Sequence, residues 1–286
     1  MKRENAKKVL CPSLILRGKK VVLSCPVELR RTACMKNKHI DRVCSVDVGI
    51  NTAATAAIVD TTGTVIARKF FDSGRHNDQR DNLHMHIAAK QKASHGGIGR
   101  RLGAGFCKTL YRRIAGISLD CARSMASELI AFALKHGAHA LAVEDLKGWK
   151  PKGRGKTQRK RFHRFQHRML VKYLTFRCEE LGIRLMSVFA RGTSYFAYDG
   201  SGPVKRDKTN ATQATFSNGR RYNADLNGAY NIAARALALL LKIPDVKVKG
   251  TESSPERTDK SFGRSSRIPT VLAHVWAFHA RKCAVA

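Results

Sequence analysis

The chain has 286 residues, of which 43% are hydrophobic, so it can bury the core of one large domain with appendages or of two domains. Its formal charge is +33, because 54 Lys and Arg stand against 21 Asp and Glu. This excess predicts a polyanionic partner: nucleic acid first, because phosphates release counterions as cations approach, and an anionic membrane surface as the competing candidate.

The first 40 residues are short and strand-like. In SLILRGKKVVLSCPVEL, two apolar runs flank Gly18, Lys19 and Lys20, which is a hairpin signal. We expect residues 1–40 to be the β-rich remnant of an N-terminal wedge or barrel domain.

From Val43 the pattern changes to three β-rich runs, at 43–48, 53–59 and 64–71, which we read as an antiparallel meander. A polar, His-rich helix is expected at 75–95. A long amphipathic helix is expected at 106–136, because its apolar residues recur at steps of three and four.

A buried strand at 138–146, AHALAVEDL, ends in two acids and leads into the most basic part of the chain. Residues 147–168 hold ten Lys or Arg and no acid. A helix at 163–181 and a strand at 183–189 follow.

Residues 193–222 are rich in Gly, Thr, Asn and Ser without a regular period, and an apolar helix is expected at 225–241. We expect residues 242–286 to form a largely disordered tail, because 244–268 is polar and rich in Pro and Ser. The apolar patch VLAHVWAFHA near the end either packs back on the fold or is read-through sequence.

The order β-β-β-α-β-α-β-α is that of an RNase H-like domain, so the predicted fold class is α/β, with a mixed sheet flanked by helices. The predicted divisions are a first part of this domain at 41–192, an insert at 193–222, and its last helix at 223–241.

Carboxylates stand on three of these elements. Asp47 lies in the first strand, on the face opposite Val46, and a buried carboxylate there is costly unless it is paired or binds metal. Glu144 ends the fourth strand, with Asp145 beside it as a competing ligand, and Asp225 opens the last helix.

Asp225 has a second interpretation, because either it or Asn223 could cap the helix. Taken together, Asp47, Glu144 and Asp225 suit a divalent-metal site, because Mg²⁺ prefers hard oxygen ligands. Two such ions about 4 Å apart can activate a water and stabilise the leaving oxygen of a phosphodiester.

Four segments resemble the TnpB family, the transposon-encoded RNA-guided nucleases related to type V CRISPR effectors and often named transposases. These are SVDVGINTAAT, AVEDLKG, the stretch FHRFQHRMLVKYLTFRCEELGIRLMSV followed by RGTS, and RYNADLNGAYNIAAR. The resemblance implies that Asp47, Glu144 and Asp225 are the catalytic acids of a RuvC-like nuclease site. They would bind two Mg²⁺, or Mn²⁺, and cleave DNA by water attack, guided by RNA in full-length relatives.

Two features depart from the TnpB pattern. The family carries a zinc ribbon before the last catalytic helix, whereas no cysteine lies between Cys178 and Cys283 here, so no zinc is expected. The family's N-terminal half is also absent from this sequence. A branch of the family has sequence similar to DGSG and NGRRYN, so the absence of the zinc ribbon can be a property of that branch.

We expect the nucleic-acid contacts to come from basic side chains of the 147–168 block and of the insert. They are Lys147, Lys150, Lys152, Arg154, Lys156, Arg159, Lys160, Arg161, Arg164, Arg168, Lys205, Arg206, Arg220 and Arg221. Tyr195, Phe196, Tyr198 and Phe216 either stack on bases or pack the insert.

The sequence therefore predicts a Mg²⁺-dependent endodeoxyribonuclease with DNA and guide RNA as partners. Two alternatives stay open: a nucleic-acid-binding protein without activity, and a cut-and-paste transposase of the same fold. No run of apolar residues is long enough for a membrane span and no signal peptide opens the chain, so we expect a cytoplasmic protein associated with the nucleoid.

Overall fold

The computed structural model describes most of the chain. The described residues are 7–29, 40–49, 52–95, 102–103, 105–147, 167–207, 209–244, 246–247, 267–268 and 270–285. Eight of the predicted nucleic-acid contacts, Lys150, Lys152, Arg154, Lys156, Arg159, Lys160, Arg161 and Arg164, lie outside these residues. None of the described helices is both long and apolar enough to cross a membrane.

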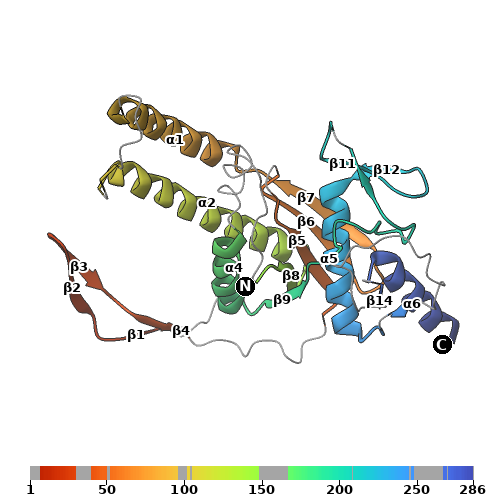
Figure 1. Cartoon of the computed structure of the whole chain (residues 1–286). Helices are drawn as coiled ribbons and strands as arrows, with labels where there is room; N and C mark the ends of the chain where they lie inside the picture. The colour runs from red at the N-terminus through yellow and green to blue at the C-terminus, as the bar shows by residue number, and fades with distance from the viewer. Residues whose placement is uncertain are drawn as a thin grey trace.

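A five-stranded mixed sheet forms the centre of the protein, in the order β7-β6-β5-β8-β9 (Figure 1). Its strands are β5 (Arg42–Asp47), β6 (Ala54–Asp60), β7 (Val65–Phe71), β8 (Ala140–Asp145) and β9 (Arg184–Phe189). The pairs β5–β6 and β6–β7 are antiparallel, while β5–β8 and β8–β9 are parallel. The predicted meander followed by alternating strands and helices is confirmed.

Helices cover both faces of this sheet (Figure 1). On one face lie α2 (Lys108–Lys135) and α4 (His167–Leu181), with α1 (Gly74–His95) alongside α2. On the other face lies α5 (Ala224–Leu241).

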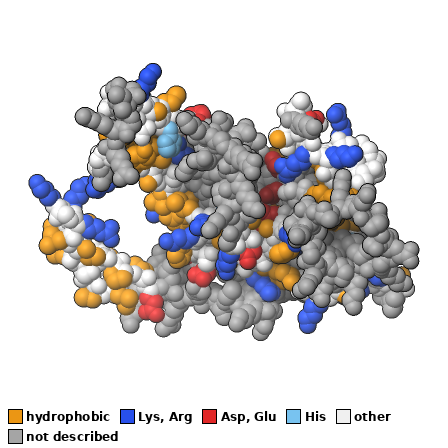
Figure 2. Space-filling model, in the orientation of Figure 1, with side chains coloured by type: hydrophobic (Ala, Val, Ile, Leu, Met, Phe, Trp, Pro, Cys, Tyr) orange, Lys and Arg blue, Asp and Glu red, His pale blue; other side chains and the backbone are white. Residues whose placement is uncertain are grey.

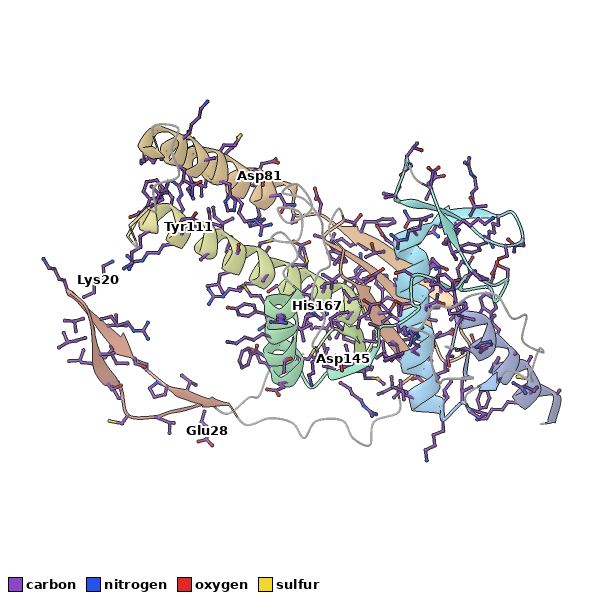
Figure 3. All side chains as sticks on the ribbon, viewed as in Figure 1. Lys20, Glu28, Asp81, Tyr111, Asp145 and His167 are labelled. Carbon is purple, nitrogen blue, oxygen red and sulfur yellow. The ribbon has the colours of Figure 1, made fainter. Side chains whose placement is uncertain are left out.

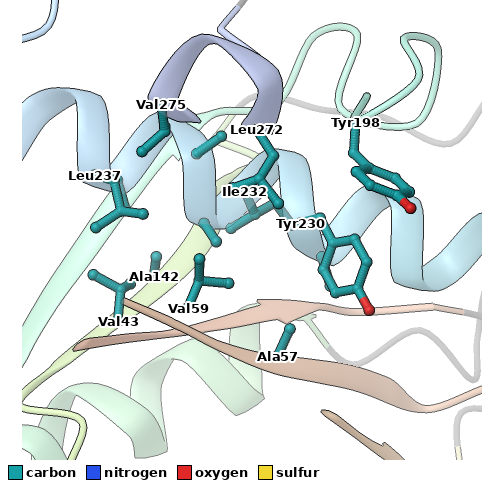
Figure 4. Packing of buried hydrophobic residues seen from close by; sticks show 14 of the residues in the cluster. Val43, Ala57, Val59, Ala142, Tyr198, Tyr230, Ile232, Leu237, Leu272 and Val275 are labelled. Carbon is teal, nitrogen blue, oxygen red and sulfur yellow. The ribbon is translucent and has the colours of Figure 1, made fainter. Parts of the chain in front are cut away.

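The alternation of side chains along each strand separates two apolar cores. Even-numbered residues of β5, such as Cys44 and Val46, pack with α2 and α4. Val43 on β5 packs instead against Ile232 and Leu237 of α5 (Figure 4). Each such fully buried aliphatic side chain contributes about 1.5–3 kcal/mol relative to an exposed one.

The end of the chain corrects one prediction. Residues 270–285 do not belong to a disordered tail, because Leu272–Val285 form the helix α6, which packs on α5. Leu272 and Val275 are fully buried in the α5 core (Figure 4), and the indole N–H of Trp276 donates to the carbonyl of Gly63 at 2.9 Å. The apolar patch therefore packs back, because its side chains complete the outer side of α5.

The N-terminal segment is β-rich, as predicted. A short ladder joins β1 (Lys7–Val9) to β4 (Val27–Leu29), and β2 (Ser13–Arg17) pairs with β3 (Lys20–Ser24) in a hairpin that extends away from the sheet (Figure 3, Lys20). Gly18 adopts a φ of +64° in its turn. That this segment is the remnant of another domain stays a prediction.

The insert forms a small three-stranded sheet of β10 (Lys205–Arg206), β11 (Gln213–Thr215) and β12 (Arg221–Asn223). Its base is an aromatic cluster centred on Tyr198. Four rings surround that of Tyr198 at centroid distances of 5.1–6.2 Å, those of Phe216, Tyr222, Tyr230 and Trp276. Burying these rings supplies apolar area that anchors the insert to α5 and α6. Tyr198 and Phe216 therefore pack the insert.

Candidate active site

Asp47 ends β5 on the sheet face that α5 covers, and its side chain is half-buried. Burial raises the pKa of its carboxyl well above the ordinary value, and the nearby carboxylates of Glu144 and Asp225 raise it further. The charge of Arg206 acts in the opposite direction. Burial and the two neighbouring carboxylates therefore favour the protonated, neutral form of Asp47.

Glu144 is brought beside Asp47 by strand register. Val46 of β5 pairs with Val143 of the parallel strand β8, so Asp47 and Glu144 are the next residues of adjoining strands. Glu144 also has a raised pKa because of burial, although the Thr193 hydroxyl that donates to its Oε1 and the charge of Arg235 lower it. The sheet therefore places two carboxylates side by side at the carboxyl ends of two inner strands.

The choice between Glu144 and Asp145 follows from strand alternation. Glu144 is half-buried and held by Thr193, whereas Asp145 is exposed and accepts the backbone N–H of Lys147 at 3.0 Å. Figure 3 labels Asp145, the last residue of β8, and His167, the first residue of α4, near one another. Glu144 is thus the acid that lies on the same face of the sheet as Asp47.

Asp225 lies in the first turn of α5, and Asn223 is the residue that caps this helix. The Asn223 Oδ1 accepts the N–H groups of Asp225 and Leu226 at 3.0 and 2.9 Å. Because Asn223 satisfies these donors, the Asp225 carboxylate is not engaged as the cap, and it stands at the positive end of the helix dipole.

Gly228 allows α5 to approach the sheet at the site. A β-carbon at position 228 would overlap Oδ2 of Asp47 and lie 3.2 Å from its Cγ. The absent side chain therefore provides the space that the Asp47 carboxylate occupies.

The same helix holds the loop that orients Glu144. Asn231 donates through Nδ2 to the carbonyls of Thr193 and Phe196 at 2.8 and 2.7 Å, and Asn227 donates to Phe196 at 2.9 Å. Thr193 in turn donates its hydroxyl to Glu144. Asn227 and Asn231, which are buried on α5, thus fix the loop that carries Thr193, and Thr193 contacts Glu144 on β8.

Arg235 supplies a buried positive charge near Glu144. Its guanidinium donates to the carbonyl of Phe189, and burial lowers its pKa to about 10, although Glu144 acts to raise it. Sequence reasoning missed Thr193, Asn231 and Arg235 as supporting residues. For Asn231 and Arg235 the available signal was the polar spacing of four in NGAYNIAAR, which places Asn227, Asn231 and Arg235 on one helix face.

These acids line one cavity of about 1130 Å³, which opens where the sheet meets the insert. Asp47, Glu144 and Asp225 all border it. So do three cations, Lys147, Arg191 and Arg206. Figure 2 shows acidic side chains beside Lys and Arg side chains in this region.

The donor set suits a hard divalent cation. The described residues contain no group of three or more His, Cys, Asp or Glu side chains arranged to hold a metal ion by themselves. Mg²⁺ does not require such a cage, because it usually retains several waters and binds through one or two carboxylates plus substrate phosphates. Four carboxylates line the cavity, because the exposed Asp145 borders it as well. Those of Asp47, Glu144 and Asp225 fit Mg²⁺ by their chemistry.

The predicted nucleic-acid contacts that lie within the described residues divide into two groups. Lys147 and Arg206 border the cavity. Arg168, Lys205, Arg220 and Arg221 are exposed away from its lining, and the Arg220 guanidinium lies 5.3 Å from the centroid of the Tyr222 ring. Tyr195 lines the cavity and is 51% exposed, so it remains available for base stacking.

No protein-family model and no curated protein matches the sequence. Solved structures do match. The Cas12f1–sgRNA–target DNA complex aligns with a TM-score of 0.51 and 13% identity over 82% of this chain and 68% of that chain. The fold is RuvC-like.

Two further neighbours are the AacC2c1–sgRNA–extended non-target DNA ternary complex and the mini-RNA-guided endonuclease CRISPR-Cas_phi3. Their TM-scores are 0.49 and 0.45, each at 14% identity, over 61% and 70% of this chain and 23% and 44% of those chains. This chain therefore spans about two thirds of Cas12f1 and less than half of the other two. The predicted RNase H-like fold class is confirmed, while the narrower resemblance to TnpB stays a prediction.

Proposed function

We propose that this chain is a metal-dependent endodeoxyribonuclease of the TnpB type, which uses a guide RNA in its full-length relatives. The observation that carries the proposal is that Asp47, Glu144 and Asp225, from three separate elements of a RuvC-like fold, border one cavity together with cations. Acids alone would repel a phosphodiester, and cations alone would only bind one. The combination supports both binding and cleavage.

Asp47, Glu144 and Asp225 would hold Mg²⁺, for which Mn²⁺ can substitute. When bound, such ions activate a water and stabilise the leaving oxygen of the phosphodiester. Thr193 keeps one Glu144 oxygen in place, and the positive charge of Arg235 offsets the negative charge of Glu144.

Lys147, Arg191 and Arg206 would contact the phosphates of the strand that enters the cavity. Arg206 is suited to this role because it is exposed and its charge already acts on Asp47. The neighbour Cas12f1 was solved with sgRNA and target DNA, which supports both nucleic acids as partners here.

The test is cleavage of end-labelled DNA with Mg²⁺, with the protein purified alone and after co-expression with RNA from its own locus. Glu144→Gln keeps the shape and removes the charge, and we expect it to reduce cleavage at least 100-fold while DNA binding persists. Asp145→Asn is the comparison variant, because Asp145 also borders the cavity but is exposed and accepts the backbone N–H of Lys147. Its cleavage should remain within about threefold of wild type.

Equal loss in both variants would mean that the total negative charge of the cavity, and not the half-buried Glu144 beside Asp47, governs the activity. A wild-type protein that binds DNA or RNA tightly and cuts neither, alone or with RNA, would contradict the nuclease proposal and favour the binding-protein alternative.

A further inference from the structure

Thr55 of β6 carries a buried hydroxyl at the edge of the cavity. The residue is 1% exposed, and its Oγ1 has no hydrogen-bond partner within the described part of the chain. Thr55 lines the same cavity as Asp47, Glu144 and Asp225.

An unsatisfied buried hydroxyl is costly. Leaving such a group without a partner costs about 1–3 kcal/mol, and valine would fill almost the same volume with equal preference for a strand. Ser45, on the same face of the sheet, avoids this cost because its hydroxyl donates to the carbonyl of Ala57 at 3.2 Å. Thr55 thus lacks the protein acceptor that offsets the cost of burying the Ser45 hydroxyl.

Strand register places this hydroxyl beside a carboxylate. In the antiparallel pair β5–β6, Thr55 lies directly opposite Asp47. Side chains of directly opposed residues share a face, with β-carbons about 4.5–5.5 Å apart. A carboxylate only accepts hydrogen bonds, and a threonine hydroxyl can donate one, so the two groups are complementary.

We propose that Thr55 is a positioning residue, whose hydroxyl donates to the Asp47 carboxylate in the metal-loaded site and fixes the oxygen that faces the ion. This inference rests on the proposed function. Groups that hold metal ligands in this way typically change metal affinity 10- to 100-fold when they are removed.

The test compares Thr55→Val with wild type by two measurements that do not depend on cleavage. The first is the melting temperature without metal, which should be unchanged or higher in Thr55→Val, because the unsatisfied hydroxyl is gone. The second is Mn²⁺ affinity by titration calorimetry, which should fall about 10-fold or more. Thr55→Ser retains the hydroxyl and should restore affinity to within about threefold of wild type.

Ser45→Ala is the matched control, because it removes a buried hydroxyl that already has a partner. It should lower the melting temperature and leave Mn²⁺ affinity unchanged. Thr55→Val overturns the inference if it behaves like Ser45→Ala, with lower stability and unaltered affinity. If wild type takes up no Mn²⁺, either alone or with DNA whose phosphates can complete the site, the proposed function fails and this inference fails with it. If wild type binds Mn²⁺ and Thr55→Val binds it equally well, the inference alone fails.

Discussion

Gly228 of α5 faces Asp47 of β5 so closely that a β-carbon on Gly228 would overlap the Asp47 carboxylate. The contact joins the first strand of the sheet to the helix that carries Asp225. A glycine near the start of this helix therefore allows the helix that carries Asp225 to approach Asp47 closely.

Gly228→Ala should displace Asp47 or α5. Alanine favours a helix by about 1 kcal/mol over glycine, but overpacking costs about 1–3 kcal/mol, so we expect unchanged or lower stability together with a loss of cleavage. Chemical denaturation and the cleavage assay measure the two effects. Gly116→Ala is the control, because a β-carbon there meets nothing within 4 Å, and this variant should gain stability. A Gly228→Ala protein that gains as much stability as Gly116→Ala and cuts normally would refute the close contact.

Neutralising Asp47 should stabilise the metal-free protein at neutral pH. The pKa of Asp47 is raised above 3.8 in the folded state, so the folded protein binds more protons there than the unfolded chain. The contribution of this group to stability is therefore favourable at low pH and is lost as pH rises from about 4 through the raised pKa.

Asp47→Asn should consequently melt at a higher temperature than wild type at pH 7, by about 2–4 °C for each kcal/mol relieved, with a smaller difference at pH 4. Added Mg²⁺ should stabilise wild type and not the variant, because only wild type retains all three proposed ligands. Thermal melts at both pH values, with and without Mg²⁺, check this, and a lower melting temperature for metal-free Asp47→Asn at pH 7 would contradict it.

Asn231→Ala should weaken both the fold and the site. The substitution leaves the buried carbonyl of Thr193 without its donor, at a cost of about 1–3 kcal/mol, and loosens the residue that holds Glu144. Urea denaturation should show this loss, and cleavage should fall as well. Asn218→Ala removes two exposed bonds, one to Asp199 and one from the backbone N–H of Arg220, and should change stability by no more than about 0.5 kcal/mol. Similar values for the two variants would count against the role of Asn231.

Leu272→Ala tests whether α6 belongs to the folded domain. Leu272 is fully buried against α5, so the truncation should cost about 2–5 kcal/mol. Leu239 on α5 is 63% exposed, and Leu239→Ala should have little effect on denaturation. If Leu272→Ala unfolds at the same urea concentration as wild type, α6 does not stabilise α5.

Much of the architecture was predictable because it depends on local pattern. The period of apolar residues placed the five central strands and the helices α2 and α5 within a few residues of their observed bounds. The strand–helix order predicted the RNase H-like class, and acids at element ends in a chain of charge +33 indicated Asp47, Glu144 and Asp225. These features follow from side-chain alternation, helix period and composition, which are properties of short segments.

Other features depended on how distant segments pack together. The sequence left open whether Asn223 or Asp225 caps α5, and the hydrogen bonds of Asn223 decide it. It could not reveal that Thr193 holds Glu144, since 49 residues separate them, or that the last apolar patch covers α5. The period of apolar residues in the sequence shows which face of an element is apolar. Only the register and the close packing of the elements determine which polar groups on different elements meet.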